Sequence, residues 1–463
     1  MRGQGLLMQG VTATFFAALL GGCSDNGQPA PSVMFTAPAS AMSIHLGQAV
    51  GLAWGAMLAD SCTASVSDPA GGTFAGSQPT GGGARVAPTA TGSFVYTLKC
   101  TGAGGTTSVS SPAVTVTPPI LNTLSTITTI GSTVDPIENG DNPYGLAIAP
   151  ATAGLISAGD LIVCNFNDGA TQTEGQGTTI VGLHPAPGAT PYRIAQSAWL
   201  LGCNALTMLP DDSISAAAWS ANQNPLLSPA GTVTTPFAAD TFARPWGEAY
   251  APASGAGAAA LYISNFDGSI DRIVLNGDLQ MSMTRIASGF CGSGSPGSIF
   301  APAGLTYDAS IDTLYIVDTS SYSVIAFAYV SSIPADGILV SGSCSAVATA
   351  PTPVPTFGGP SAGSARVIAN GGPFIAPISA ALLADGDLIV GNGDINIGDG
   401  QTPNLAVEVS PWVPGGFVGQ PVRLDPSDTP GALFGIAATV DGSGNQIVYF
   451  NDDNTNSVMM LTR

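Results

Sequence analysis

Short apolar runs separated by turn residues recur along most of the chain. A clear example is the Leu-Tyr-Ile run at 261–263, which is followed by the Asn-Phe-Asp-Gly turn at 265–268. Beyond the turn, Ile270, Arg272 and Val274 alternate with their neighbours, as in a partly exposed strand. Aromatic and β-branched residues favour strands, whereas Asn, Asp and Gly accept the backbone angles of tight turns. The pattern therefore predicts a strand, a turn and a second strand.

The same unit recurs with variation, so that six copies can be aligned. Their anchor residues are Gly145, Ala205, Gly247, Gly304, Ala380 and Gly435. The second and fifth copies are the most degenerate. Most anchor spacings exceed the roughly 40–50 residues of a propeller blade, which predicts loop insertions in the longer units.

The consensus of these copies is Pro-x-Gly-hydrophobic, then Leu-Tyr-Ile/Val-x-Asp/Asn, then hydrophobic-x-x-hydrophobic. It resembles the NHL repeat of six-bladed β-propellers and covers residues 120–463. The last copy ends after its third strand, and residues 120–130 precede the first copy without a unit of their own. We therefore expect 120–130 to supply the fourth strand of the last blade, so that both ends of the domain share one blade.

Residues 32–118 precede the repeats and show a different pattern. Val50, Leu52 and Trp54 alternate with small residues, as do Phe94, Tyr96 and Leu98, and Gly-rich turns lie between such runs. This arrangement predicts a small β-sandwich. It resembles the Ig-like domains of exported bacterial proteins, although Trp54 precedes the first cysteine. The expected fold class is thus all-β, with a small Ig-like sandwich, acting as a spacer or adhesive module, before a six-bladed propeller.

The start of the chain has the features of an export signal. Residues 1–23 contain Arg2, an apolar stretch and the sequence Leu-Gly-Gly-Cys ending at Cys23, which resembles a bacterial lipobox. The resemblance implies a lipid on Cys23 and, with Ser24 after it, sorting to the outer membrane. Residues 24–31 then form a tether. We therefore expect an outer-membrane lipoprotein that faces the periplasm or the cell surface. The alternatives are an ordinary cleaved signal and a buried Cys23 without lipid.

The remaining cysteines form an even set, as in exported proteins with disulfides. Sequence order and domain layout favour three pairs, Cys62–Cys100, Cys164–Cys203 and Cys291–Cys344. A buried free thiol is the alternative for any one pair.

Charge narrows the possible partners. The 463 residues include 30 acidic and 10 basic side chains, which gives a net charge of −20. Such a chain repels nucleic acid and anionic lipid headgroups, so we expect no nucleic-acid partner and membrane attachment through the lipid anchor alone. The oligomeric state is left open.

Catalytic motifs are scarce. The two histidines, His45 and His184, lie in different predicted domains, which argues against a histidine metal centre or a Ser-His-Asp triad. The Gly-x-Ser-x-Gly match at 359–363 lies in a Pro/Gly-rich loop without the strand and helix of a nucleophile elbow. The acidic segment 394–400 has the wrong offsets for an EF-hand loop, so we expect no cofactor or metal, with Ca²⁺ as an open alternative.

Blade topology suggests a ligand-binding face. The turn between the second and third strands of a blade lies on the same face as the start of its first strand. The candidate ligand-binding residues on that face are Tyr144, Trp246, Glu248, Phe434, Asn165, Asp168, Asn265, Asp267, Asp318, Asn392, Asp394, Asn451 and Asp452. Aromatic rings beside amides and carboxylates suit a sugar, a peptide or a protein loop, although packing between blades is the alternative role for each ring.

These sequence observations leave two candidate functions. The preferred one is a non-catalytic binding or scaffold module for a protein, peptide or glycan. The other is a propeller enzyme of lactonase-like or lyase-like type, with a metal in the channel near Glu248.

Overall fold

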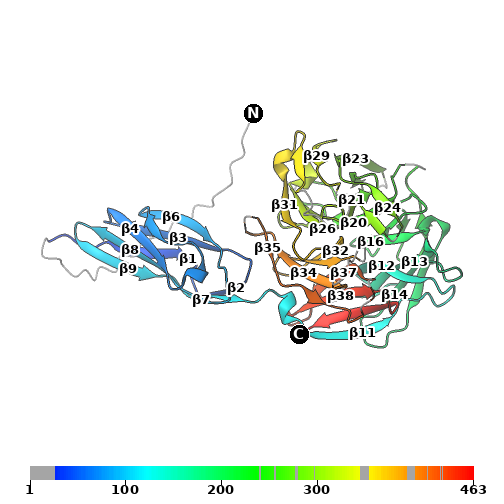
Figure 1. The fold of residues 1–463 in the computed structure, drawn as a ribbon, viewed down its shortest axis with the longest axis horizontal. Coiled ribbons are helices and arrows are strands. Elements are labelled where there is room, and N and C mark those ends of the chain that lie inside the picture. Colours follow the sequence, from blue (N-terminus) through cyan, green and yellow to red (C-terminus); the bar gives the residue numbers. More distant parts are fainter. Residues whose placement is uncertain are drawn as a thin grey trace. The chain divides into compact units, whose positions relative to one another are not determined.

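The structure is a computed structural model, and its fold is shown in Figure 1. It describes residues 27–238, 241–254, 257–276, 280–296, 298–344, 354–393, 402–413, 415–427, 429 and 431–463. The chain divides into two compact units, Met1–Thr117 and Pro118–Arg463. The predicted lipidation site, Cys23, and the candidate residue Asp394 lie outside the described residues.

The secondary structure is almost entirely β. Five single-turn 3-10 helices are present in the described ranges: η1 (Pro69–Gly71), η2 (Leu121–Thr123), η3 (Ala198–Leu200), η4 (Val330–Ser332) and η5 (Ala362–Ser364). No helix in this described part of the chain has the length and apolarity that crossing a membrane requires.

Three small sheets form the first unit. They are β1 (Ser32–Ala37), β3 (Val50–Met57) and β6 (Gly81–Val86); β2 (Met42–His45), β10 (Val114–Thr117) and β7 (Gly92–Phe94); and β5 (Gly76–Gln78), β4 (Ser61–Val66), β8 (Tyr96–Gly102) and β9 (Gly105–Ser110). Apolar side chains from all three sheets share one core. At its centre Phe74 makes edge-to-face contacts with Trp54 and Tyr96, at centroid distances of 5.5 and 5.8 Å.

The disulfide of this unit joins two neighbouring strands. Cys62 of β4 lies directly opposite Cys100 of β8 in one antiparallel sheet. In antibody-type Ig domains the conserved disulfide instead joins the two sheets of the sandwich. The Ig-like assignment of residues 32–118 therefore stays a prediction.

Besides one two-stranded hairpin, the described residues of the second unit form six larger sheets. In chain order they contain β12 (Asp141–Ile148), β13 (Leu161–Asn167), β14 (Glu174–Leu183) and β15 (Tyr192–Gln196); β16 (Cys203–Met208), β17 (Ile214–Ala218), β18 (Leu226–Leu227) and β19 (Val233–Thr234); β20 (Pro245–Ala251), β21 (Ala260–Asn265), β22 (Ile270–Asn276) and β23 (Gln280–Ser288); β26 (Pro302–Asp308), β27 (Thr313–Asp318), β28 (Ser323–Ala328) and β31 (Ala365–Asn370); β32 (Pro377–Leu382), β33 (Leu388–Asn392), β34 (Leu405–Ser410), β35 (Phe417–Val418) and β36 (Val422–Arg423); and β37 (Ala432–Val440), β38 (Gln446–Asp452), β39 (Ser457–Thr462) and β11 (Thr126–Ser132).

These sheets form a closed ring. The first strand of each sheet contacts the first strand of the next, in the order β12, β16, β20, β26, β32, β37 and back to β12. Each sheet is thus one blade around a central channel, numbered 1 to 6 in this order, which defines a six-bladed β-propeller. The six repeats expected from the sequence correspond to these six blades.

The last blade is built from both ends of the unit. Strand β11 pairs antiparallel with β39, from Thr126 opposite Thr462 to Ser132 opposite Ser457. The expected fourth strand is therefore confirmed, and it begins at Thr126. Since β11 covers the edge of β39, the ring closes without an unpaired strand at the seam.

The glycines of the repeat allow neighbouring blades to approach closely. A Cβ atom at Gly247 would overlap the carbonyl oxygen of Ala303 in the next blade, and one at Gly435 would overlap that of Tyr144. At Gly247 and Gly435 glycine therefore leaves space for the adjacent first strand, because a side chain at either position would push two blades apart. Alanine takes the corresponding position in the second and fifth copies, at Ala205 and Ala380.

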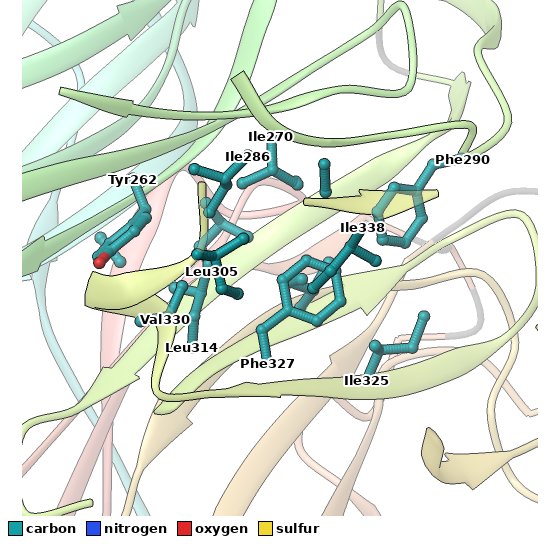
Figure 2. Packing of buried hydrophobic residues seen from close by; sticks show 14 of the residues in the cluster. Tyr262, Ile270, Ile286, Phe290, Leu305, Leu314, Ile325, Phe327, Val330 and Ile338 are labelled. Carbon is teal, nitrogen blue, oxygen red and sulfur yellow. The ribbon is translucent and has the colours of Figure 1, made fainter. Parts of the chain in front are cut away.

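An insertion between β28 and β31 extends blade 3. Strand β29 (Ile338–Ser341) pairs parallel with β23, and β30 (Thr356–Gly358) pairs with β29. Figure 2 shows Ile338 of this insertion packed among Ile270, Phe290 and Phe327 of blades 3 and 4. The hairpin of β24 (Ser293–Ser295) and β25 (Ser298–Phe300) precedes blade 4.

The two remaining disulfides lie in the propeller. Cys164 on β13 pairs with Cys203 on β16, which links blades 1 and 2. Cys291, after β23, pairs with Cys344, after β29. All three pairings expected from sequence order are confirmed, and three disulfides are typical of a protein that works outside the cytoplasm.

Candidate functional site

One face of the propeller carries the start of every first strand and the end of every second strand. The strand register shows this directly, since Pro245 lies opposite Asn265, Pro302 opposite Asp318 and Pro377 opposite Asn392. We call this the turn face. The residues selected from the sequence repeats and included in the described ranges are grouped at or below this face.

The three candidate aromatic residues are buried below the turn face. Tyr144 stacks between Phe166 and Phe434, with ring centroids 4.2 and 4.0 Å away, and Trp246 meets it edge-on. Tyr144, Trp246 and Phe434 are 2%, 4% and 8% exposed. They form part of an apolar cluster between blades, so they pack against one another and offer little surface to a ligand.

Most of the amide and carboxylate candidates are buried as well, where they fasten loops. Asn165 donates to the carbonyl oxygens of Thr133 and Gly140, both at 3.0 Å. Buried polar side chains are placed in the same way at Asn265, Asp318, Asn392, Asn451 and Asp452. Because buried polar groups need partners, these contacts account for much of the Asn/Asp signal in the repeat.

Two of the acidic candidates reach the surface. Asp168 accepts from the backbone N–H groups of Thr171 and Thr173 and from the Thr171 hydroxyl. These bonds, that of Thr173 first, lower the pKa of Asp168. Asp267 forms an ion pair with Arg285, with a nitrogen–oxygen distance of 3.3 Å. Both carboxylates can be approached by a ligand.

The central channel is narrow and holds one acidic side chain, Glu248. The first strands of all six blades line a cavity of about 90 Å³. This volume holds a few water molecules and falls well below the roughly 300–1,000 Å³ of small-molecule pockets. Among the described residues, no three His, Cys, Asp or Glu side chains converge in it.

Only one of the two oxygens of the Glu248 carboxyl has hydrogen-bond partners. Its Oε1 accepts from the Ser215 hydroxyl and from Nδ2 of Asn224, the latter at 3.0 Å. Its Oε2 is buried without a hydrogen-bond partner. Burial raises the pKa of Glu248 to about 7, and the two donors only partly oppose this effect. The carboxyl can therefore exchange a proton near neutral pH.

A larger groove opens on the turn face of blade 1. It has a volume of about 430 Å³ and lies between residues 137–140, before β12, and 168–170, after β13, with Thr178 and Thr179 between them. Asp168 lines one wall, and Glu138, half exposed, lines the other. Ile137 is 67% exposed beside them, so the groove combines two carboxylates with an apolar side chain.

A buried ion pair between Asp135 and Arg193 positions the side of the groove that carries Glu138. Asp135 accepts from the backbone N–H groups of Ile137 and Glu138, at 3.1 and 2.6 Å. Its other contacts are to Arg193, whose Nε donates to Oδ1 at 2.8 Å. Burial would raise the pKa of Asp135, but Arg193 and the two backbone donors outweigh it and lower the pKa. The wall is thus held by a charged carboxylate.

Comparisons with known proteins describe the fold only. No family model matches the chain, and no curated protein matches it. Similar solved structures include a protein of unknown function from Bacteroides thetaiotaomicron, 12% identical with a TM-score of 0.46, covering 95% of this chain and 100% of that one. An inactive virginiamycin B lyase from Staphylococcus aureus is 12% identical, with a TM-score of 0.41 and coverages of 73% and 99%. A gluconolactonase from Xanthomonas campestris is 13% identical, with a TM-score of 0.40 and coverages of 73% and 98%.

These likenesses are too distant to transfer an activity, because a shared fold does not imply a shared function. The class of this protein, an all-β chain with a six-bladed propeller, follows from its own closed ring of sheets.

Proposed function

We propose that the protein is an exported lipoprotein whose propeller binds a ligand in the groove of blade 1 and does not catalyse a reaction on it. The ligand we favour is a peptide or protein segment with a basic side chain. In this proposal Cys23 carries the lipid, residues 24–31 form a tether, and the Ig-like unit at 32–118 acts as a spacer before the propeller at 120–463.

The groove on the turn face carries this proposal. Its volume of about 430 Å³ fits a few ligand residues, whereas the channel of about 90 Å³ does not. Glu138 and Asp168 offer two carboxylates to a guanidinium or ammonium group, and Ile137 offers apolar contact to the aliphatic stem. The net charge of −20 attracts such ligands at long range.

Fluorescence polarisation with labelled peptides tests the proposal. A peptide library with Arg or Lys at its centre is compared with the same library carrying Gln there. We expect basic peptides to bind and Glu138→Gln to weaken the binding roughly ten-fold, which corresponds to about 1.4 kcal/mol. Ala170→Trp, which fills the groove from its exposed rim, should abolish binding.

The matched control is Asp441→Asn, since Asp441 lies in the turn between β37 and β38 on the opposite face. It removes the same charge and should leave binding unchanged. Equal binding of basic and neutral peptides, or an equal loss in Asp441→Asn, would overturn the proposal.

A propeller enzyme is the second candidate, and Glu248 favours it. A buried carboxyl with one unpartnered oxygen and a pKa of about 7 suits general acid or base catalysis. A screen of lactones with and without divalent metal ions tests this function. Turnover that disappears in Glu248→Gln, in a variant that still folds, would establish it in place of the binding module.

The predicted signal cleavage and lipid anchor are tested separately, by mass spectrometry of the native protein. We expect a mature chain that begins at a lipidated Cys23. Retention of an intact signal peptide with an unmodified Cys23 would contradict the anchor and would leave the binding groove untouched.

A further inference from the structure

Three acidic side chains meet in blade 5, away from both the channel lining and the groove. Asp385 and Asp387 lie in the turn between β32 and β33, and Glu408 lies on β34. Carboxylate oxygens of the three lie within 4.8 Å of one another. This is the only such group among the residues that the structure describes.

The strand register explains how they meet. Leu388 pairs with Val409 and Ile389 with Glu408, so the residue before β33 lies diagonally next to Glu408 on the same side of the sheet. The turn itself is tight, because the backbone N–H of Asp387 donates to the Asp385 carboxylate at 3.1 Å and Gly386 has a positive φ of 85°. Asp387 and Glu408 are therefore placed by backbone geometry.

Asp387 is buried without a positively charged partner. Its side chain is 0% exposed, and neither carboxylate oxygen makes a well-formed hydrogen bond, although Ser410 and Trp412 lie near enough to interact weakly. No ion pair of the described residues includes Asp387 or Glu408. Buried carboxylates are normally paired with a cation or coordinate a metal, so this arrangement lacks a positive charge.

Glu408 has partners that leave it able to coordinate. Its Oε1 accepts from the backbone N–H of Ile120 at 3.1 Å, and its Oε2 accepts from that of Leu121 at 2.6 Å. Each carboxylate oxygen has a second lone pair, so both bonds are compatible with a bound cation. Asp385 is partly exposed, which gives an ion and its waters a route from solvent.

We propose that Asp385, Asp387 and Glu408 bind a divalent cation of the calcium type. Three carboxylates supply up to six oxygen ligands, and water at Asp385 completes the shell that Ca²⁺ requires. Oxygens within 4.8 Å of one another can reach a common Ca²⁺ at about 2.4 Å. Mg²⁺ usually keeps several waters and takes only one or two carboxylates, so a set of three carboxylates favours Ca²⁺. The site would tie the segment before β11 to blade 5 through Glu408, and it is independent of the proposed groove.

The burial of these groups supports the proposal. Asp387 and Glu408 are 0% and 1% exposed, and buried carboxylates without a countercharge are unfavourable. A divalent ion would supply the missing countercharge.

Terbium luminescence of the full-length protein tests the site, because Tb³⁺ is an oxygen-seeking substitute for Ca²⁺. Trp412 lies against Gly386 in the turn between the two aspartates and should sensitise bound Tb³⁺. We expect a luminescence signal in the chelator-treated protein that CaCl₂ displaces. The signal should fall several-fold in Trp412→Phe, while calcium still raises the melting temperature of that variant.

Calorimetric titration with CaCl₂ and MgCl₂ gives the second measurement. Asp387→Asn should weaken Ca²⁺ binding at least ten-fold, whereas Asp441→Asn, which removes an exposed carboxylate elsewhere, should not change it. Since Asp387→Asn also removes buried charge, it should remain folded. Absence of Ca²⁺ binding, a response to Mg²⁺ alone, or equal Ca²⁺ affinity in wild type and Asp387→Asn would overturn the assignment and would indicate carboxyls that share protons.

Discussion

The side-chain amide of Asn451 donates to the carbonyl oxygen of Tyr144 at 2.9 Å, across the seam between the last blade and the first. The same amide reaches the carbonyl oxygen of Gly145 at 3.3 Å. Asn451 is 1% exposed, so these oxygens have no access to bulk water at this point. One asparagine of β38 thus connects blade 6 to the first strand of blade 1, which lies far from it in sequence.

Asn451→Ala should therefore destabilise the propeller by about 1–3 kcal/mol, because it removes a buried donor and leaves its acceptors without that partner. Denaturant unfolding followed by tryptophan fluorescence measures the change. Asn445→Ala is the control, since Asn445 is exposed and bonds only to Asp441 in a surface turn. A loss below about 0.5 kcal/mol for Asn451→Ala would show that the seam does not need this contact.

Gly435→Ala should also weaken the seam, for a steric reason. The new methyl group would overlap the carbonyl oxygen of Tyr144 and approach Leu146, so blades 6 and 1 would have to separate. We expect a loss of about 2 kcal/mol or more, as in other overpacked sites. Gly442→Ala is matched to it, because a Cβ there meets nothing within 4 Å. Equal melting temperatures for the two variants would contradict this explanation of the repeat glycine.

Glu248 should make stability depend on pH. Its pKa is raised to about 7 in the folded state, so the native protein binds a proton that the unfolded chain releases at about pH 4.3. Stability should accordingly fall as the pH rises from about 4.3 to 7 and level off above that range. Glu248→Gln keeps the shape without the charge, so its stability relative to wild type should rise by roughly 2–3 kcal/mol between pH 5 and pH 8.

Thermal unfolding at several pH values, with Asp441→Asn as a reference, measures this difference. A constant difference between Glu248→Gln and wild type across the range would mean that the carboxyl is charged throughout.

The Cys291–Cys344 disulfide should contribute strongly to stability, because it closes a loop with a sequence separation of 53. The chain-entropy model gives about 4 kcal/mol for such a loop. The double variant Cys291→Ser/Cys344→Ser should lose stability of this order, and dithiothreitol should have less effect on it than on wild type. An unchanged melting temperature would indicate that β29, through its pairing with β23, fixes the insertion alone.

Periodicity and turn chemistry were sufficient for the strands of the repeats, the six blades and the shared last blade, and sequence order with domain layout was sufficient for the disulfide pairs. They also placed Trp246 and Tyr144 near the channel, since repeat position determines the face of the propeller. The burial of these two rings could not be predicted in the same way, because burial depends on which side chains cover a residue. The stack of Tyr144 with Phe166 and Phe434 joins three strands from two blades, and the sequence pattern does not reveal it.

The groove and the acidic group were missed for related reasons. Ile137 and Glu138 precede the first repeat, in a segment that has only turn signals. Glu408 follows Asp387 by some twenty residues, and only the pairing of β33 with β34 unites them. An alternating strand with an acidic residue at a position expected to face inward, as at Glu408 between Val407 and Val409, is the one signal that could have indicated such a site.

The position of β11 restricts when this protein can mature. Its partner β39 follows every other strand of the ring in sequence, and β11 precedes them all. During synthesis β11 therefore has no partner until nearly the whole domain has been made, and its edge stays available to other chains until then. A chain without β39 cannot close the ring, so the last blade forms only when both ends of the domain are present.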